Sequence, residues 1–216
     1  GPEGLSCLVA DMRDEGVRVV PTRKLTGDSD FCTLYFDDVK IPKNQLIGVP
    51  GGGWAIVTHA AAQERLIVGA APSLLQELRE LVHLANDSFF NGRPAIEDSE
   101  IRQKLAQLEI EGAMLRCTTL RFLSGLTRGS RFGPESSVAK QIACSLAPKI
   151  SALSLELLGL RGLIEDDRAS STGEIWLRRM LASQALSIGR GSSDIQRTLI
   201  ARTILKLPAH SPCSQN

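Results

Sequence analysis

The sequence predicts an α+β protein that is mainly α, with part of an antiparallel β-domain over residues 1–49 and an up-and-down helical bundle over residues 50–216. Three observations support this fold class. Short runs rich in β-branched and aromatic residues occupy the first part of the chain. A glycine-rich break follows at residues 48–53. Beyond the break, the apolar period changes from two residues to about 3.6.

Four segments of the first part are predicted strands, at residues 5–10, 16–21, 32–36 and 39–42. The second alternates in polarity and is expected to stop at Pro21, and the fourth at Pro42. Turn-forming residues separate the segments at 14–16, 26–29 and 37–38. Three or four strands are too few for an independent β-domain, so they predict part of a larger sheet.

Two long amphipathic helices are predicted next. The first runs from residue 54 to 84 with its apolar residues on one face, and Pro72 is expected to kink it. The second runs from 98 to 126 and repeats apolar residues at alternating spacings of four and three, which is typical of a bundle. Gly112 within the second helix indicates that a neighbouring helix approaches closely.

Three further helices complete the predicted bundle. One runs from Pro134 to about residue 158, with Pro148 as an interior irregularity. Another covers residues 174–187. The last covers 194–205 and follows a predicted capping box in which Ser193 pairs with Gln196.

Composition excludes several classes of function. A formal net charge of +1 and an aromatic content of 4% argue against a nucleic-acid reader. The five cysteines form no metal-ligand spacing, which predicts no metal site, reduced thiols and an intracellular protein. No apolar run reaches about 18 residues, so we expect no membrane span. The chain opens at Gly1 without Met, so we expect that it starts inside a longer protein. A presequence removed from that longer protein would agree with this start.

Glu64 is a candidate general base. Its neighbours on the predicted helix are Ala60, Ala61, Ile67 and Val68, and an inward-facing carboxylate among such residues would have a raised pKa. The alternative is a surface acid beside Arg65, and the sequence alone leaves both open.

Two glycine-containing loops are candidate ligand sites. Gly189, Arg190, Gly191 and Ser192 precede a capped helix, and free backbone N–H groups beside an arginine suit an anion. The alternative is an ordinary helix–helix loop. The segment from Gly159 to Gly162 reads as a helix C-cap followed by a turn.

Together these segments resemble the acyl-CoA dehydrogenase family. Gly191-Ser192 followed by Ile195-Gln196-Arg197 and Ile200-Ala201-Arg202 is similar to the family's C-terminal signature. Phe36-x-x-Val39-x-Ile41-Pro42 resembles a strand motif of the middle domain, and Gly53-Trp54 resembles the opening of the first C-terminal helix. Gly159-x-x-Gly162 matches part of the family's G-G-x-G turn. The resemblance covers almost the whole chain.

The resemblance implies a four-helix bundle of the acyl-CoA dehydrogenase type and the loss of the N-terminal domain and the first half of the β-domain. It implies FAD-dependent α,β-dehydrogenation of an acyl-CoA, with Glu64 as the base and Arg65 as a substrate-side partner. It places Gly159, Gly162, Arg190, Gly191, Ser192 and Asp194 against FAD. The implied partners are an electron-transfer flavoprotein or another acceptor and further subunits in a homo- or hetero-oligomer, as a dimer or tetramer. The implied compartment is the bacterial cytoplasm, or the mitochondrial matrix in a eukaryote.

The sequence departs from the family at several positions. Arg190 stands where many members carry the catalytic Glu, although some members place that Glu on the first bundle helix, as Glu64 would be here. Ser88 or Phe90 stands where the family commonly has an Arg that reaches the flavin pyrophosphate, and Ser99 replaces a Gln. Two alternatives therefore stay open: a non-catalytic partner subunit of a heteromeric enzyme, and a related acyl-CoA oxidase or nitroalkane-oxidising flavoenzyme.

Overall fold

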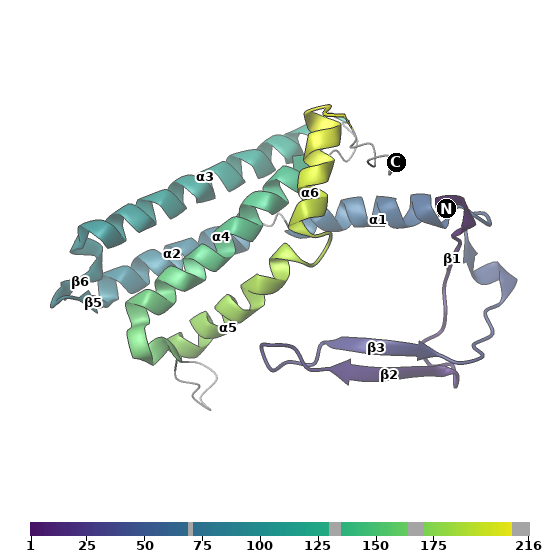
Figure 1. The fold of residues 1–216 in the computed structure, drawn as a ribbon, viewed down its shortest axis with the longest axis horizontal. Coiled ribbons are helices and arrows are strands. Elements are labelled where there is room, and N and C mark those ends of the chain that lie inside the picture. The colour runs from purple at the N-terminus through teal and green to yellow at the C-terminus, as the bar shows by residue number, and fades with distance from the viewer. Residues whose placement is uncertain (69–70, 130–134, 164–170, 209–216) are drawn as a thin grey trace, which may run out of the picture. The chain divides into compact units, whose positions relative to one another are not determined.

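The computed structural model describes residues 1–68, 71–129, 135–163 and 171–208, without the side chains of 62–68 and 71. The chain divides into two compact units, Gly1–Gln63 and Glu64–Asn216 (Figure 1). The fold class is as predicted, because small antiparallel sheets precede a set of packed helices. The predicted domain boundary between residues 49 and 50 stays a prediction.

The first unit holds two antiparallel strand pairs. β2 (Val17–Thr22) pairs along its whole length with β3 (Phe31–Phe36), from Val17 opposite Phe36 to Thr22 opposite Phe31. The short strands β1 (Cys7–Leu8) and β4 (Leu46–Ile47) form the second pair. The single-turn helices η1 (Pro2–Gly4) and η2 (Lys43–Gln45) flank this second pair.

Two strand predictions were wrong in detail. Residues 39–42 form no strand, because Pro42 lacks a ladder donor and instead caps the 3₁₀ turn of η2. The partner of β1 is β4, a few residues later. β2 also continues through Pro21 to Thr22, with Pro21 opposite Cys32. A two-stranded ribbon has a free edge on each strand, so the missing N–H of a proline is tolerated there.

The second unit contains a four-helix bundle of α2 (Ala71–Asp87), α3 (Ser99–Thr127), α4 (Glu135–Leu158) and α5 (Thr172–Gln184) (Figure 1). α1 (Gly53–Val68) precedes it and α6 (Ser193–Leu199) follows it, continuing as the π-helical turn η6 (Ile200–Ile204). A small hairpin of β5 (Phe89–Phe90) and β6 (Arg93–Pro94) joins α2 to α3 through η3 (Ala95–Glu97). The 3₁₀ turns η4 (Gly159–Leu163) and η5 (Ala185–Ser187) follow α4 and α5.

The described residues of the predicted helix over 54–84 are helical, with α1 ending at Val68 and α2 beginning at Ala71. Residues 69 and 70 between them lie outside the described part of the chain. The kink predicted at Pro72 therefore stays a prediction.

The core of the bundle surrounds α4, which contacts α2, α3, α5 and α6. The apolar stripe predicted for α3 is confirmed, with Ile101, Leu105, Leu108, Leu115 and Phe122 buried. Gly112 lies against α2, because a Cβ there would stand 3.0 Å from Leu78 Cδ2. The stretch Glu135–Leu163 is long and apolar enough to span a membrane, but 56% of its most apolar window is buried in the bundle. The core helix of a bundle can pass the same test of length and composition.

Candidate functional site

The proposed catalytic pair lies on α1. Glu64 and Arg65 fall within the helical segment Gly53–Val68, as predicted, but their side chains lie outside the described part of the chain. The roles of Glu64 as base and of Arg65 as its substrate-side partner therefore stay predictions.

The loop before α6 has an unusual backbone. Arg190 and Gly191 both lie in the left-handed region, with φ of 58° and 87°. That region costs an ordinary residue about 1–2 kcal/mol, whereas glycine enters it freely. A Cβ on Gly191 would also stand 2.6 Å from Gln196 Nε2. Only glycine fits this position without a local shift.

Two buried side chains hold the carbonyl groups of this loop. The Lys140 ammonium, on α4, donates a hydrogen bond to the Gly191 carbonyl oxygen. Gln196 Nε2, on α6, donates to the carbonyl oxygens of Arg190 and Gly191, at 3.2 Å each. Lys140 and Gln196 are both 0% exposed. The loop is thus bonded to the interior through its C=O groups.

The first turn of α6 differs from the predicted capping box. The N-cap is Ser192, one residue earlier than expected, and its Oγ accepts from the Ile195 N–H at 3.4 Å. Gln196 is buried and does not return to the cap, because its amide bonds the carbonyl groups of Arg190 and Gly191 instead. Asp194 pairs with Arg197 at 2.9 Å on the surface.

Cys144 lies one turn after Lys140 on α4, and its thiol donates to the Leu186 carbonyl oxygen at 2.9 Å. Burial raises the pKa of the Cys144 thiol, and the nearby Lys140 charge only partly opposes this shift. The thiol therefore stays protonated and unreactive at neutral pH.

The turn after α4 requires glycine for packing. Gly159 closes the helix with φ of 55°. Gly162 is buried, and a Cβ there would stand 3.0 Å from Leu155 Cδ2. A Cβ on Gly173, at the start of α5, would stand 2.4 Å from the Arg161 carbonyl oxygen. Close approach of α4, η4 and α5 thus explains Gly162 and Gly173 without a ligand, and the left-handed backbone explains Gly159.

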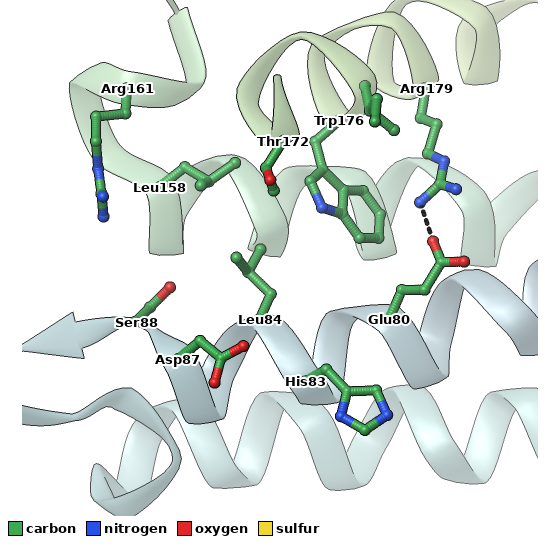
Figure 2. A pocket seen from close by; sticks show the side chains of 11 residues that line it. Glu80, His83, Leu84, Asp87, Ser88, Leu158, Arg161, Thr172, Trp176 and Arg179 are labelled. Carbon is green, nitrogen blue, oxygen red and sulfur yellow. Dashed lines mark hydrogen bonds and ion pairs between the residues drawn. The ribbon is translucent and has the colours of Figure 1, made fainter. Parts of the chain in front are cut away.

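A cavity of about 600 Å³ lies between α2 and the η4–α5 segment. Figure 2 shows Arg161 and Thr172 on one side of it, and Leu84, Asp87 and Ser88 on the other. The remaining lining residues are Glu80, His83, Leu158, Ile175, Trp176 and Arg179. Ser88 and Arg161 therefore share one cavity.

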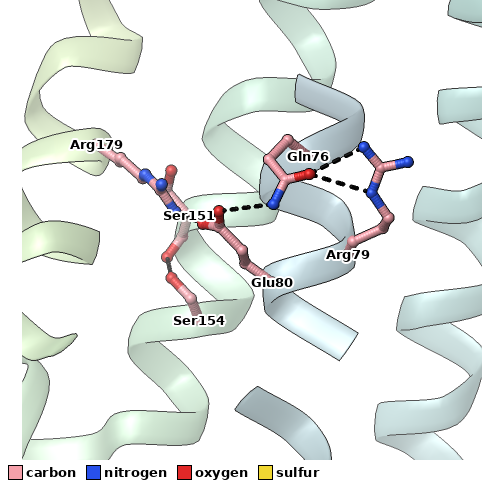
Figure 3. A network of polar contacts seen from close by, with 6 residues as sticks. All are labelled: Gln76, Arg79, Glu80, Ser151, Ser154 and Arg179. Atoms are coloured by element: carbon pink, nitrogen blue, oxygen red, sulfur yellow. Dashed lines mark hydrogen bonds and ion pairs between the residues drawn. The ribbon is translucent and has the colours of Figure 1, made fainter. Parts of the chain in front are cut away.

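An ion pair lines one end of this cavity. Arg179 Nη1 lies 2.6 Å from Glu80 Oε2, and its guanidinium lies 4.5 Å from the Trp176 ring centroid. Figure 3 shows Gln76 between Arg79 and Glu80; its Nε2 donates to Glu80 Oε1 at 3.1 Å and its Oε1 accepts from Arg79 Nη2 at 2.9 Å. Burial opposes ionisation of Glu80, but the hydrogen bonds from Arg179 and Gln76 prevail and lower its pKa.

The two predicted flavin loops lie near opposite ends of α4. Gly191 is bonded to Lys140 near the start of the helix, whereas Gly159 follows its end. A helix rises 1.5 Å per residue, so about 28 Å separate Lys140 from Gly159. The structure brings Arg190, Gly191, Ser192 and Asp194 together, and places Gly159 and Gly162 at the other end.

Sequence reasoning missed Lys140 and Gln196 as parts of the loop. A lysine on an otherwise apolar helix face was the available signal for the first, since lysine is almost never fully buried without a partner. The cavity had no local signal, because its walls come from segments far apart in the sequence. Among the described residues, no group of three or more His, Cys, Asp or Glu side chains is placed to hold a metal ion.

Comparison with known proteins identifies a family and its relatives. Residues 51–205 match the family described as acyl-CoA dehydrogenase, C-terminal domain. The chain is 29% identical over 209 residues to the acyl-CoA dehydrogenase IpdE1 of Mycolicibacterium smegmatis, covering 95% of this chain and 50% of that protein.

Solved structures agree in fold. The acyl-CoA dehydrogenase from Geobacillus kaustophilus superposes with a TM-score of 0.84 at 24% identity, over 95% of this chain and 53% of that one. The ChsE4–ChsE5 complex from Mycobacterium tuberculosis superposes with a TM-score of 0.84 at 23% identity, over 97% and 55%. The chain thus spans about half the length of the relatives it matches.

Proposed function

Because this chain belongs to the acyl-CoA dehydrogenase family, we propose that it forms part of an enzyme that removes hydrogen from the α and β carbons of an acyl-CoA thioester. The observation that carries the proposal is the family match over residues 51–205, on a chain whose bundle has the matching fold.

FAD is the cofactor we propose, and the residues present suit it. A diphosphate needs cations and hydrogen-bond donors, and adenine needs a partly apolar wall. The cavity beside η4 offers Arg161, Ser88 and Thr172 together with the aromatic ring of Trp176. At the other end of α4, Arg190, Gly191 and Ser192 would contact the flavin, with Asp194 at the helix start. When bound, FAD supplies the acceptor for the β-hydride.

Glu64 is the proposed base. Its carboxylate would take the α-proton of the thioester, a role that apolar helix neighbours favour by raising the pKa toward neutrality. Arg65 would lie beside the substrate or hold the helix. Arg190 would not serve as a base, because a guanidinium stays protonated at any ordinary pH.

A second candidate is a partner subunit that completes a flavin site on another chain. The two predicted flavin loops lie about 28 Å apart along α4, so each would contact the flavin of a different subunit, which favours a chain that completes the site of another. Ser88 or Phe90 in place of the family's arginine would also weaken one of these two contacts. The ChsE4–ChsE5 structure carries the names of two chains in one complex, and a heteromer of this kind is the assembly this candidate predicts.

The remaining partners and the compartment follow the family proposal. An electron-transfer flavoprotein or another acceptor would reoxidise the flavin. The protein would assemble as a dimer or tetramer in the bacterial cytoplasm, or in the mitochondrial matrix of a eukaryote.

The visible spectrum of the complete purified protein tests the proposal. A flavin band that bleaches under anaerobic conditions on addition of an acyl-CoA is expected. A flavin-free protein that acquires FAD only when co-expressed with a second homologous chain would favour the partner subunit. A protein that binds no flavin in either form would refute both candidates.

A further inference from the structure

We propose that Lys140 and Gln196 are positioning residues that fix the Arg190–Gly191 peptide carbonyls inward and thereby present the N–H edge of this loop to the flavin. The inference rests on the proposed function for its ligand, but its structural half stands on the contacts alone. The loop carries no regular secondary structure, so another force must set its conformation.

The donors converge on two adjacent carbonyl groups. Lys140 and Gln196 come from different helices, α4 and α6, and both are fully buried. Gln196 bonds both carbonyl oxygens, and Lys140 bonds the second. A charged donor makes the stronger hydrogen bond of the two kinds, so Lys140 dominates the hold on Gly191.

The geometry of Gln196 shows that these carbonyls fix its orientation. Within the described part of the chain, Gln196 Oε1 is buried and has no hydrogen-bond partner. A flipped amide would give up both carbonyl contacts, so the unsatisfied oxygen is the cost of holding the loop. Gln196 Nε2 thus holds the loop, while Gln196 Oε1 stays without a hydrogen bond to any described residue.

The consequence for the loop follows from the planar trans peptide. The N–H and C=O of one peptide unit point in opposite directions. With the carbonyls of Arg190 and Gly191 turned inward, the N–H groups of Gly191 and Ser192 turn outward, beside the exposed Arg190. The left-handed φ angles at Arg190 and Gly191 are the backbone conformation that this orientation imposes.

The substitution that tests the role is Lys140→Met, with Lys149→Met as the matched control. Lys149 lies on the same helix, but its ammonium pairs with Glu111 at 2.7 Å and is half exposed. Gln196→Met removes the other donor and carries the same test if Lys140→Met does not fold. Lys140 is buried, so its replacement removes no accessible tryptic site.

Two measurements on the complete protein test the hold on the loop and its effect on FAD binding separately. The first is the rate of tryptic cleavage after Arg190 in the flavin-free protein, which a locked loop resists. The second is the dissociation constant for FAD, followed by flavin fluorescence. We expect both variants to accelerate cleavage. Lys140→Met should weaken FAD binding by about 10- to 100-fold, the range of a buried hydrogen bond from a charged donor, and Gln196→Met by about 2- to 10-fold, the range of a neutral donor. Lys149→Met should change neither.

Any other outcome would contradict either the hold on the loop, the positioning role or the proposed function. Unchanged cleavage after Arg190 in a folded Lys140→Met or Gln196→Met protein would overturn the hold on the loop. Faster cleavage with an unchanged FAD dissociation constant would overturn the positioning role. A wild-type protein that binds no FAD would refute the proposed function, while the cleavage rates still decide whether Lys140 and Gln196 hold the loop.

Discussion

Glu77 and Glu80 lie one turn apart on α2 beside the same guanidinium, that of Arg179, and their pKa values shift in opposite directions. Burial raises the pKa of Glu77, and attraction to Arg179 only partly offsets this. The hydrogen bonds from Arg179 and Gln76 to Glu80 outweigh its burial and lower its pKa. Arg179 therefore stabilises mainly the carboxylate of Glu80, whereas burial dominates the pKa of Glu77.

The two acids predict opposite pH effects on stability. Because the pKa of Glu77 is raised in the folded protein, Glu77 stabilises the protein below its ordinary pKa of about 4.5. This contribution is lost as the pH rises through the raised pKa. Glu77→Gln should thus stabilise the protein near neutral pH, and the gain should shrink as the pH falls toward 4.5. Glu80→Gln should destabilise it near neutral pH by up to about 1 kcal/mol, and the loss should shrink as the pH falls below about 4.5. Thermal unfolding of both variants across this range checks the signs, and two shifts of the same sign would contradict the assignment of Arg179.

Replacing Glu64 by Gln tests the proposed base. Exchange of the substrate α-proton should fall by about 10²- to 10⁴-fold, the usual contribution of a general base, while FAD stays bound. Exchange is measured in deuterated water with an acyl-CoA. Glu109→Gln, which changes an exposed acid on α3, should leave exchange unaltered. Undiminished turnover by Glu64→Gln would remove this residue from the mechanism.

Gly191 and Gly189 should respond differently to the same substitution. Gly191→Ala places a Cβ 2.6 Å from Gln196 Nε2 at a φ of 87°, and should cost about 1–3 kcal/mol of unfolding free energy. Gly189→Ala meets only the Ala185 carbonyl, at 3.3 Å, and has no positive φ, so its cost should be smaller than that of Gly191→Ala. Urea unfolding of the two variants compares them directly, and equal costs would mean that the loop conformation is not fixed.

Gly112 should tolerate little extra volume. A Cβ there would stand 3.0 Å from Leu78 and 3.3 Å from Leu75, both on α2. Gly112→Val should therefore destabilise the bundle by about 1–3 kcal/mol through overpacking. Ala113→Val, one residue later on the exposed side of α3, is the control and should cost about 0.5 kcal/mol through helix propensity. Chemical denaturation of both separates packing from propensity.

The helices of the bundle could be predicted from periodicity because their packed faces repeat. The apolar stripe of α3 and the close approach at Gly112 are confirmed. Strand pairing was harder. The partner of β1 depended on chain pairing across more than thirty residues, which no local pattern encodes.

The candidate loops could be located from the sequence, but their supports could not. The pattern Ser193-x-x-Gln196 satisfied a capping box, and only the structure shows that the carbonyls of Arg190 and Gly191 take the Gln196 amide instead. Lys140 likewise has no motif of its own, since its acceptor lies about fifty residues later. The cavity beside η4 joins α2 to a turn that follows α4, so it depends on the bundle being formed.

The environment of Cys144 makes it a chemical reporter of local opening. Cys32 and Cys117 are exposed and should react quickly with a maleimide, whereas Cys144 is buried and its thiol is held neutral by a raised pKa. Modification of Cys144 requires α4 to separate from Leu186, just before the loop that Lys140 holds. Its labelling rate, divided by that of Cys117, therefore measures how often this corner of the bundle opens while the remainder stays folded.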